Sequence, residues 1–169
     1  HIHAHRADDI FTAVRIAEEF GLDYCVVHCT QGHLIADRLA KAGVKAFSGP
    51  LISDRCKPEL KDSTPATPGV LSKAGVKTAI VTDHPVIPIQ YLPLCAGLAV
   101  REGMTHEDAL RAITINPAEI CGIADRVGSL EVGKDADMSL FDSDPLTLFA
   151  KPLLVVGDGE ILMEGKSNA

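Results

Sequence analysis

A short internal repeat constrains the fold of this 169-residue chain more than any other feature. The segment 39–46 reads Leu-Ala-Lys-Ala-Gly-Val-Lys-Ala and recurs at 71–78 as Leu-Ser-Lys-Ala-Gly-Val-Lys-Thr. Each copy combines the last turn of a helix, a glycine that can end it, and the apolar start of a strand. A looser copy surrounds Gly21. The repeat therefore predicts consecutive βα units, in which each helix ends at a glycine and leads directly into a strand.

The strands predicted after these glycines are short and largely apolar, which is typical of a parallel sheet covered on both faces. They are expected at 24–27, 44–47 and 76–81. Aromatic residues make up only 4% of the chain, so the core must be built from Ala, Val, Leu and Ile. The helices between the strands carry apolar residues at helical spacing, and the first is expected to be capped by Asp8 or Asp9.

The loop 51–68 and the chain after residue 83 show different patterns. The polar, proline-bearing stretch 51–68 is expected to be a surface loop. Helices are predicted over 91–103, from the capping box at Thr105 to about residue 115, and between Pro117 and Gly122. Strands follow at 137–142, 153–156 and 160–164, the last two joined by a Gly-Asp-Gly turn. We therefore expect a βα region, a boundary near residue 120, and a small β region.

Charge and composition argue against several classes of partner. The net charge is −7 and no Lys/Arg cluster is present, which disfavours nucleic acid as a partner. No apolar run is long enough to cross a membrane, and no leader peptide is visible. The five cysteines form no Cys-x-x-Cys pair, which favours free thiols in a reducing cytoplasm. Because the first residue is His1 rather than Met, and His-Ile-His-Ala-His is unlike a tag, we expect the start to be an internal position of a longer chain.

Ionisable side chains follow the predicted strands at equivalent places. His3 ends the first strand, His28 the second and Asp83 the fourth, whereas the third leads into Ser48-Gly49-Pro50. In parallel βα folds the chemistry lies where strands end, so we expect these side chains to converge on one mouth. Imidazole and carboxylate are ligands suited to zinc or a similar divalent ion. Among the alternating N-terminal histidines we favour His3, with His5 as the second choice.

Less specific interpretations of these strand-end residues are also possible. A single histidine at a strand end is more often a hydrogen-bonded structural residue than a ligand, and Asp83 before His84-Pro85 could belong to an ordinary turn. The coincidence of three such residues in consecutive βα units favours a site. The rival hypothesis is a non-catalytic, flavodoxin-like α/β binding or scaffold module. A divalent ion bound by His3 and Asp83 would exclude that rival.

Several longer motifs resemble a known family. The segments Thr114-Ile-Asn-Pro-Ala-Glu-Ile-Cys-Gly122 and Gly128-Ser-Leu-Glu-Val-Gly-Lys-Asp-Ala-Asp-Met-Ser-Leu-Phe141 resemble the C-terminal signature of the amidohydrolase superfamily. Upstream, His3-Ala-His-Arg-Ala-Asp-Asp9, Val27-His-Cys-Thr-Gln-Gly32 and Val81-Thr-Asp-His-Pro85 resemble its imidazolonepropionase-like members. These motifs occur in the family's order and cover nearly the whole chain.

The resemblance implies an α/β fold that is the second half of a (β/α)8 TIM-type barrel, strands five to eight, followed by a small β-sandwich segment. Residues 1–122 would form the partial metal-dependent hydrolase barrel and residues 123–169 the sandwich segment. His3 would end strand five, His28 strand six and Asp83 strand eight. The family's strand-one His-x-His pair is absent, so we expect the fragment alone to be inactive. It is also expected to form a homo-oligomer or otherwise self-associate, since an open barrel edge exposes unpaired backbone groups.

The resemblance also implies a chemistry, namely the hydrolysis of a C–N bond in a cyclic or linear amide-like small molecule by metal-activated water. The divalent metal would be zinc, with iron, nickel or manganese as alternatives, held by His3, His28 and Asp83. Asp83 would transfer the proton, and His28 would ligate metal or contact the substrate oxygen. His5, Arg6 and His84 would contact substrate. Imidazolonepropionase itself carries acidic residues where His5-Arg6 stand, which indicates a different substrate, and a deaminase of the same superfamily is a neighbouring alternative.

Overall fold

The computed structural model describes residues 1–165, and its larger sheet has four parallel strands in the order β1-β2-β3-β4. The strands are β1 (Ile2–Ala4), β2 (Val26–His28), β3 (Lys45–Ser48) and β4 (Lys77–Ile80). Each of the last three begins one or two residues later than the sequence pattern suggests. The order never reverses, unlike the flavodoxin-like order 2-1-3-4-5. The predicted α/β class is confirmed.

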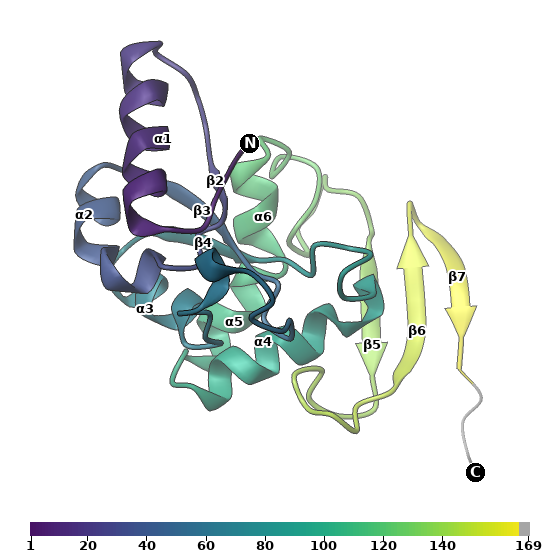
Figure 1. Ribbon diagram of the computed structural model, residues 1–169. Coiled ribbons are helices and arrows are strands. Elements are labelled where there is room, and N and C mark those ends of the chain that lie inside the picture. The colour runs from purple at the N-terminus through teal and green to yellow at the C-terminus, as the bar shows by residue number, and fades with distance from the viewer. Residues whose placement is uncertain (166–169) are drawn as a thin grey trace.

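Three helices cover one face of this sheet. They are α1 (Ala7–Glu19), α2 (Ala36–Lys41) and α3 (Thr67–Lys73), and Figure 1 shows them along one side of the strands. Ile10, Leu39 and Leu71 project from these helices and are fully buried against Val26 of β2. Branched aliphatic side chains thus form the interface, as expected for a chain with few aromatic residues.

Glycine ends each of these helices, as the repeat predicts. Gly21, Gly43 and Gly75 have φ angles of 58°, 65° and 94°, and no neighbouring atom would touch a Cβ there. The left-handed backbone is therefore the reason for glycine at these positions, because a side chain would find enough space there.

The predicted cap of α1 is wrong. The helix begins at Ala7, so Asp8 and Asp9 lie in its first turn, and the N-cap position is Arg6 without a side-chain cap. The Oε1 atom of Gln31 instead accepts a hydrogen bond of 2.8 Å from the backbone N–H of Ala7. A residue far away in sequence thus satisfies the first free amide of the helix, and local sequence gives no signal for it.

The connection from β3 to α3 is a loop, as expected for a proline-bearing stretch. Its only regular element is the short 3-10 turn η2 (Pro58–Leu60), and a similar turn η1 (Gly32–Leu34) lies between β2 and α2. The loop follows directly from the carboxyl end of β3, and it therefore lies at the end of the sheet where the predicted site residues are found.

The helices after β4 form a second packed cluster. They are η3 (Ile89–Tyr91), α4 (Leu92–Arg101), α5 (His106–Ala112) and α6 (Ile115–Ile120). The hydroxyl of Thr105 accepts a 3.1 Å hydrogen bond from the backbone N–H of Asp108, which confirms the predicted cap of α5. Ile120 of α6 packs with Val27, Phe47 and Ala79, so α6 lies on the sheet face opposite α1 (Figure 1).

The small antiparallel sheet consists of β5 (Met138–Phe141), β6 (Pro152–Gly157) and β7 (Glu160–Glu164), as the sequence predicts. The segment between β5 and β6 returns to the helices, where Leu146 is buried in the α4–α5 cluster. His106 and Asp144 are joined by a 2.9 Å hydrogen bond. The backbone N–H of Leu146 and then the His106 ring lower the pKa of the Asp144 carboxyl.

The predicted division of the chain into residues 1–122 and residues 123–169 stays a prediction. Residues 166–169 of the second part lie outside the described residues.

No helix within residues 1–165 is long and apolar enough to cross a membrane.

Candidate active site

Two histidines from neighbouring strands meet at the carboxyl end of the sheet. His3 Nδ1 lies 3.0 Å from His28 Nε2, and the ring centroids are 4.9 Å apart. In the strand register His28 is level with the buried Ala4 and Ser48, so an extended strand would direct its side chain toward the helices. Its φ of 72° interrupts that alternation. The left-handed backbone thus explains how the ring of His28 reaches His3.

A backbone carbonyl fixes the proton on His28. The Nδ1 atom of His28 lies 2.9 Å from the carbonyl oxygen of Gly49. A carbonyl can only accept, so Nδ1 carries the hydrogen and Nε2 of a neutral ring has a free lone pair. With His3 neutral, its Nδ1 donates to that lone pair, and Nε2 of His3 keeps the free lone pair of the two rings.

Gly49 holds this carbonyl in place because it approaches the end of β4 closely. Its φ is 143°, and a Cβ built there would lie 2.1 Å from the carbonyl oxygen of Val81. The flanking hydrogen bond from Val81 N–H to Ser48 O, 3.0 Å long, extends the pairing of β3 with β4. The same peptide segment therefore contacts both His28 and the strand that leads to Asp83.

His5 lies against the other side of His28. The two rings stack at 4.4 Å with an angle of 13° between their planes, and His5 Nδ1 is 2.9 Å from Thr30 Oγ1. Burial and then the neighbouring His28 lower the pKa of the His5 imidazole. The second choice made from the sequence is thus also close to the pair, through stacking.

Asp83 lies at the end of β4 in a strained turn. Its φ is 53°, and its carbonyl accepts a 2.9 Å hydrogen bond from the N–H of Val86. Asp83 and the exposed His84 line a pocket of about 510 Å³, together with His1, His3 and apolar residues such as Phe47. Non-glycine residues with positive φ cost of order 1–3 kcal/mol and cluster at functional sites. Such residues at the ends of both β2 and β4 therefore favour a site at this edge.

The predicted ligand set is only partly brought together. His3 and His28 are in contact, whereas no group of three or more His, Cys, Asp or Glu residues suited to a metal ion occurs within residues 1–165. One strand separates β2 from β4, which places their ends roughly 10 Å apart along the sheet. The inclusion of Asp83 in one ligand set with the histidines stays a prediction.

The guanidinium of Arg6 is bound within its own turn. Its Nε donates to Oδ1 of Asp8 at 2.9 Å and its Nη2 to Oδ2 at 2.8 Å, and both side chains are exposed. The hydrogen bond from Arg6 lowers the pKa of the Asp8 carboxyl. A substrate anion would have to compete with Asp8 for this bidentate pair. Substrate contact by Arg6 and by His84 stays a prediction.

Sequence reasoning missed three residues that support the histidines, namely Thr30, Gln31 and Gly49. Thr30 and Gln31 follow His28 by two and three residues, and both are buried polar side chains. Polar residues in a loop directly after a buried strand are a signal that could have been used. Gly49 was placed at a strand end by the sequence, but its role was not predicted, because glycine before proline is common in ordinary turns.

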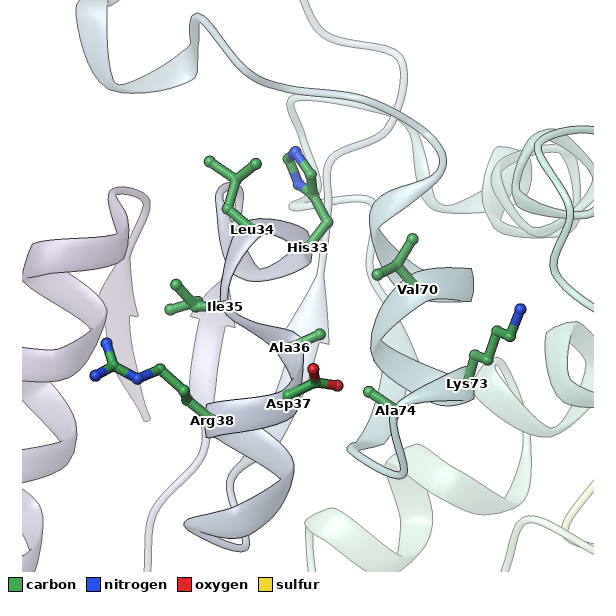
Figure 2. Close-up of a pocket in the computed structure, with 9 residues that line it drawn as sticks. All are labelled: His33, Leu34, Ile35, Ala36, Asp37, Arg38, Val70, Lys73 and Ala74. Atoms are coloured by element: carbon green, nitrogen blue, oxygen red, sulfur yellow. The ribbon is translucent and has the colours of Figure 1, made fainter.

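A second pocket lies away from the strand ends. It has a volume of about 580 Å³ and lies between the η1–α2 segment and α3, with His33, Asp37 and Lys73 in its lining. Figure 2 shows Arg38 pointing away from α3, and its guanidinium lies over the Phe11 ring at 5.0 Å. This pocket lies beside the helices that cover the sheet, so it does not share the mouth formed by His3 and His28.

The five cysteines differ in expected reactivity. Burial raises the pKa of the Cys29 thiol to about 12 and raises those of Cys25 and Cys95, whereas Cys56 and Cys121 are exposed. Because the thiolate is the reactive form, iodoacetamide at pH 8 should label the two exposed thiols first and Cys29 slowest. Peptide mass spectrometry over time measures the rates, and urea-unfolded protein is the control. Equal rates for Cys29 and Cys56 in the folded protein would contradict the structure.

Comparison with known proteins places this arrangement in a family. The model of the amidohydrolase family matches residues 1–161. An amidohydrolase crystal structure from Thermotoga maritima MSB8 is 44% identical, with a TM-score of 0.92 over 96% of this chain. The amidohydrolase tasK of Hapsidospora irregularis is 30% identical over 94% of the chain. An imidazolonepropionase of Maricaulis maris is 30% identical over 83% of it.

A parallel α/β protein with paired histidines at its strand ends is the class that the fold and the geometry define. The chain belongs to the amidohydrolase family, and the expected likeness to imidazolonepropionases is confirmed. It spans 17% of the Hapsidospora protein, 35% of the Maricaulis protein and 43% of the Thermotoga chain. The similarity therefore covers less than half the length of each of these three proteins.

Proposed function

We propose that this chain supplies part of the active site of a metal-dependent amidohydrolase that hydrolyses a C–N bond in a small amide-like molecule. The observation that carries the proposal is the contact between His3 and His28, with the tautomer of His28 fixed by Gly49. The family membership and the likeness to an imidazolonepropionase support the reaction class.

The proposed architecture is the second half of a (β/α)8 barrel followed by a β-sandwich segment. Four parallel strands in sequential order, with helices between them, are half of what such a barrel needs. The Thermotoga relative, 43% of which is covered, is long enough to hold four further strands. On this proposal the chain alone lacks the remaining ligands and is inactive, and the edges at β1 and β4 need partner strands. Self-association, a cytoplasmic location and the absence of nucleic-acid partners stay predictions.

The paired histidines fit a divalent metal. Zinc bonds to imidazole nitrogen are about 2.0–2.1 Å long, so two nitrogens of a tetrahedral site are separated by roughly 3.3 Å. His3 Nδ1 and His28 Nε2 are 3.0 Å apart. A metal held by both nitrogens would replace the hydrogen between them, so His3 would then carry its proton on Nε2. The Gly49 carbonyl bound to Nδ1 of His28 is the kind of partner that orients a ligating imidazole. The superfamily generally uses divalent metals, and zinc is the first choice here, with iron, nickel and manganese as alternatives.

The chain's own residues would have distinct tasks. His3 and His28 would hold the metal, which supplies a water of lowered pKa and polarises the substrate oxygen. Asp83 would accept the proton from the attacking water and pass it to the leaving nitrogen. The alternative role of His28, donation to the substrate oxygen, would require a proton on Nε2 as well. His5, Arg6 and His84 would contact substrate.

A chimera tests the proposal without assuming what precedes this chain in nature. The chain would replace the matching 43% of the Thermotoga amidohydrolase, so that the rest of that protein supplies the other strands. We expect the purified chimera to bind a divalent metal and to hydrolyse members of a panel of N-acyl, cyclic-imide and imidazolone substrates. A chelator should remove the activity, and added zinc should restore it. The 169-residue chain alone is the matched control and should be inactive.

A correctly folded chimera that contains stoichiometric metal but hydrolyses nothing in the panel would contradict the proposed reaction class. A folded chimera without metal would contradict the proposed roles of His3 and His28. Circular dichroism and gel filtration establish folding before either conclusion is drawn.

A further inference from the structure

Gln31 is a buried polar residue for which the proposed chemistry has no direct use. Its side chain is 9% exposed and lies directly after the segment that carries His28 and Thr30. Buried amides are retained where both of their polar ends are satisfied. The partners of Gln31 show which parts of the site it connects.

The first connection is to the turn that carries His5. The backbone N–H of Gln31 donates to the carbonyl of His5 at 2.8 Å, and Gln31 Oε1 accepts from the N–H of Ala7 at 2.8 Å. The turn between β1 and α1 is therefore held on both sides of Arg6. His5 is further held by Thr30, at 2.9 Å, and is stacked on His28. The tilt of the His5 ring thus depends on where this turn is anchored.

The second connection is to the loop between β3 and α3. Gln31 Nε2 donates to Oδ2 of Asp62 at 2.8 Å. The next residues of that loop, Ser63 and Thr64, line a small cleft together with His28. Arg55 donates to the Ser63 carbonyl at 2.8 Å, and this hydrogen bond joins the first part of the loop to its last part. One amide therefore joins the His5 turn to the loop that flanks His28.

The chemistry of these contacts requires an amide. The oxygen faces a backbone N–H and the nitrogen faces a carboxylate, so one side chain must accept at one end and donate at the other. A carboxylate at position 31 could still accept from Ala7, but it would face Asp62 with a second negative charge. An apolar side chain would leave both partners unsatisfied.

We propose that Gln31 is a positioning residue that joins the loop between β3 and α3 (residues 51–66) to the turn between β1 and α1, which carries His5. This latch keeps the loop and the turn in place beside His28. Its effect on catalysis rests on the proposed function, whereas the latch itself is a property of the folded chain. Release of the latch frees the loop, and the same event removes one anchor of the turn that carries His5.

Trypsin reports the latch directly in the 169-residue chain. The loop offers cleavage after Arg55 and Lys61, whereas Lys57 precedes Pro58 and resists cleavage. Gln31→Glu should raise the cleavage rate at both sites about tenfold, the effect of losing one partly buried hydrogen bond. Asp62→Asn should stay close to the wild-type rate, because the new side-chain oxygen still accepts from Gln31. Peptide mass spectrometry over time gives the rates.

The double variant Gln31→Glu/Asp62→Asn is the decisive one. The amide introduced at 62 can donate to the carboxylate introduced at 31, so cleavage should return to within about threefold of wild type. If Gln31 only filled space, exchanging the donor and the acceptor between positions 31 and 62 would not restore the wild-type cleavage rate. Cleavage after Lys45 and Lys77, at the starts of β3 and β4, is the internal control and should stay unchanged throughout.

Unchanged loop cleavage in Gln31→Glu, failure of the double variant to rescue, or an equal rise at Lys45 and Lys77 would each overturn the proposal. If Gln31→Glu does not fold, Asp62→Ala replaces it, since that change leaves the contact with Ala7 intact and should still release the loop. In the chimera, Gln31→Glu should lower kcat more than it raises KM. A wild-type chimera that lacks hydrolysis would contradict the proposed function and leave the trypsin result standing.

Discussion

Asp83→Asn in the chimera is expected to lower kcat/KM by about 10²- to 10⁴-fold, the usual contribution of a positioned acid–base group. Asparagine has nearly the same shape but cannot take up a proton from water at neutral pH. It also tolerates the left-handed backbone that Asp83 adopts, with φ at 53°. The loss should therefore reflect chemistry and leave folding intact. Steady-state kinetics between pH 5 and 9, on the most reactive substrate of the panel, measure it.

Asp125→Asn is the matched control. Asp125 is an exposed residue after α6 and lies outside the strand-end site, so its change should leave kcat/KM within about twofold of the parent. A loss smaller than threefold in Asp83→Asn would remove Asp83 from the catalytic role. A large loss accompanied by loss of bound metal would assign Asp83 to ligation alone.

Gly97→Ala is expected to destabilise the 169-residue chain by about 1–3 kcal/mol, the usual range for overpacking a well-packed site. In an ordinary helix interior this substitution would stabilise by roughly 1 kcal/mol, because alanine has the better helix propensity. Here a Cβ at position 97 would lie 2.1 Å from the carbonyl oxygen of Leu146, whose side chain is buried against the same helices. The close approach therefore reverses the sign of the intrinsic effect.

Urea unfolding followed by circular dichroism measures the change in free energy. Arg101→Ala is the control in α4, since that side chain is exposed and its pairing with Glu102 is a surface contact. The control should change stability by no more than about 0.5 kcal/mol. A Gly97→Ala variant that is as stable as wild type would mean that the β5–β6 connection does not pack on α4 as described.

The sequence predicted the features that depend on local chemistry. The glycine ends of α1, α2 and α3 follow from a backbone requirement that only glycine meets readily, and the cap by Thr105 is a contact within one turn. The β6–β7 hairpin was also predicted from its turn residues. These elements can be recognised in a window of a few residues.

The features that the sequence could not predict depend on contacts between distant segments. Alternation along β2 gives no reason for His28 to turn toward His3, because that needs its positive φ and the carbonyl of Gly49. The predicted cap of α1 by Asp8 or Asp9 is wrong because Gln31 accepts the hydrogen bond from the first amide of the helix. The convergence of Asp83 with the histidines also depends on how far the sheet separates β2 from β4, which no local pattern records.

The position of Gly49 couples two parts of the site that would otherwise be independent. Its carbonyl sets the tautomer of His28, and a Cβ at position 49 would clash with the carbonyl oxygen of Val81, two residues before Asp83. Any natural or engineered change that displaces the carboxylate by moving the end of β4 must also shift the imidazole. Variants with altered substrate preference should therefore arise more readily in the 51–66 loop or around His84 than in this shared peptide.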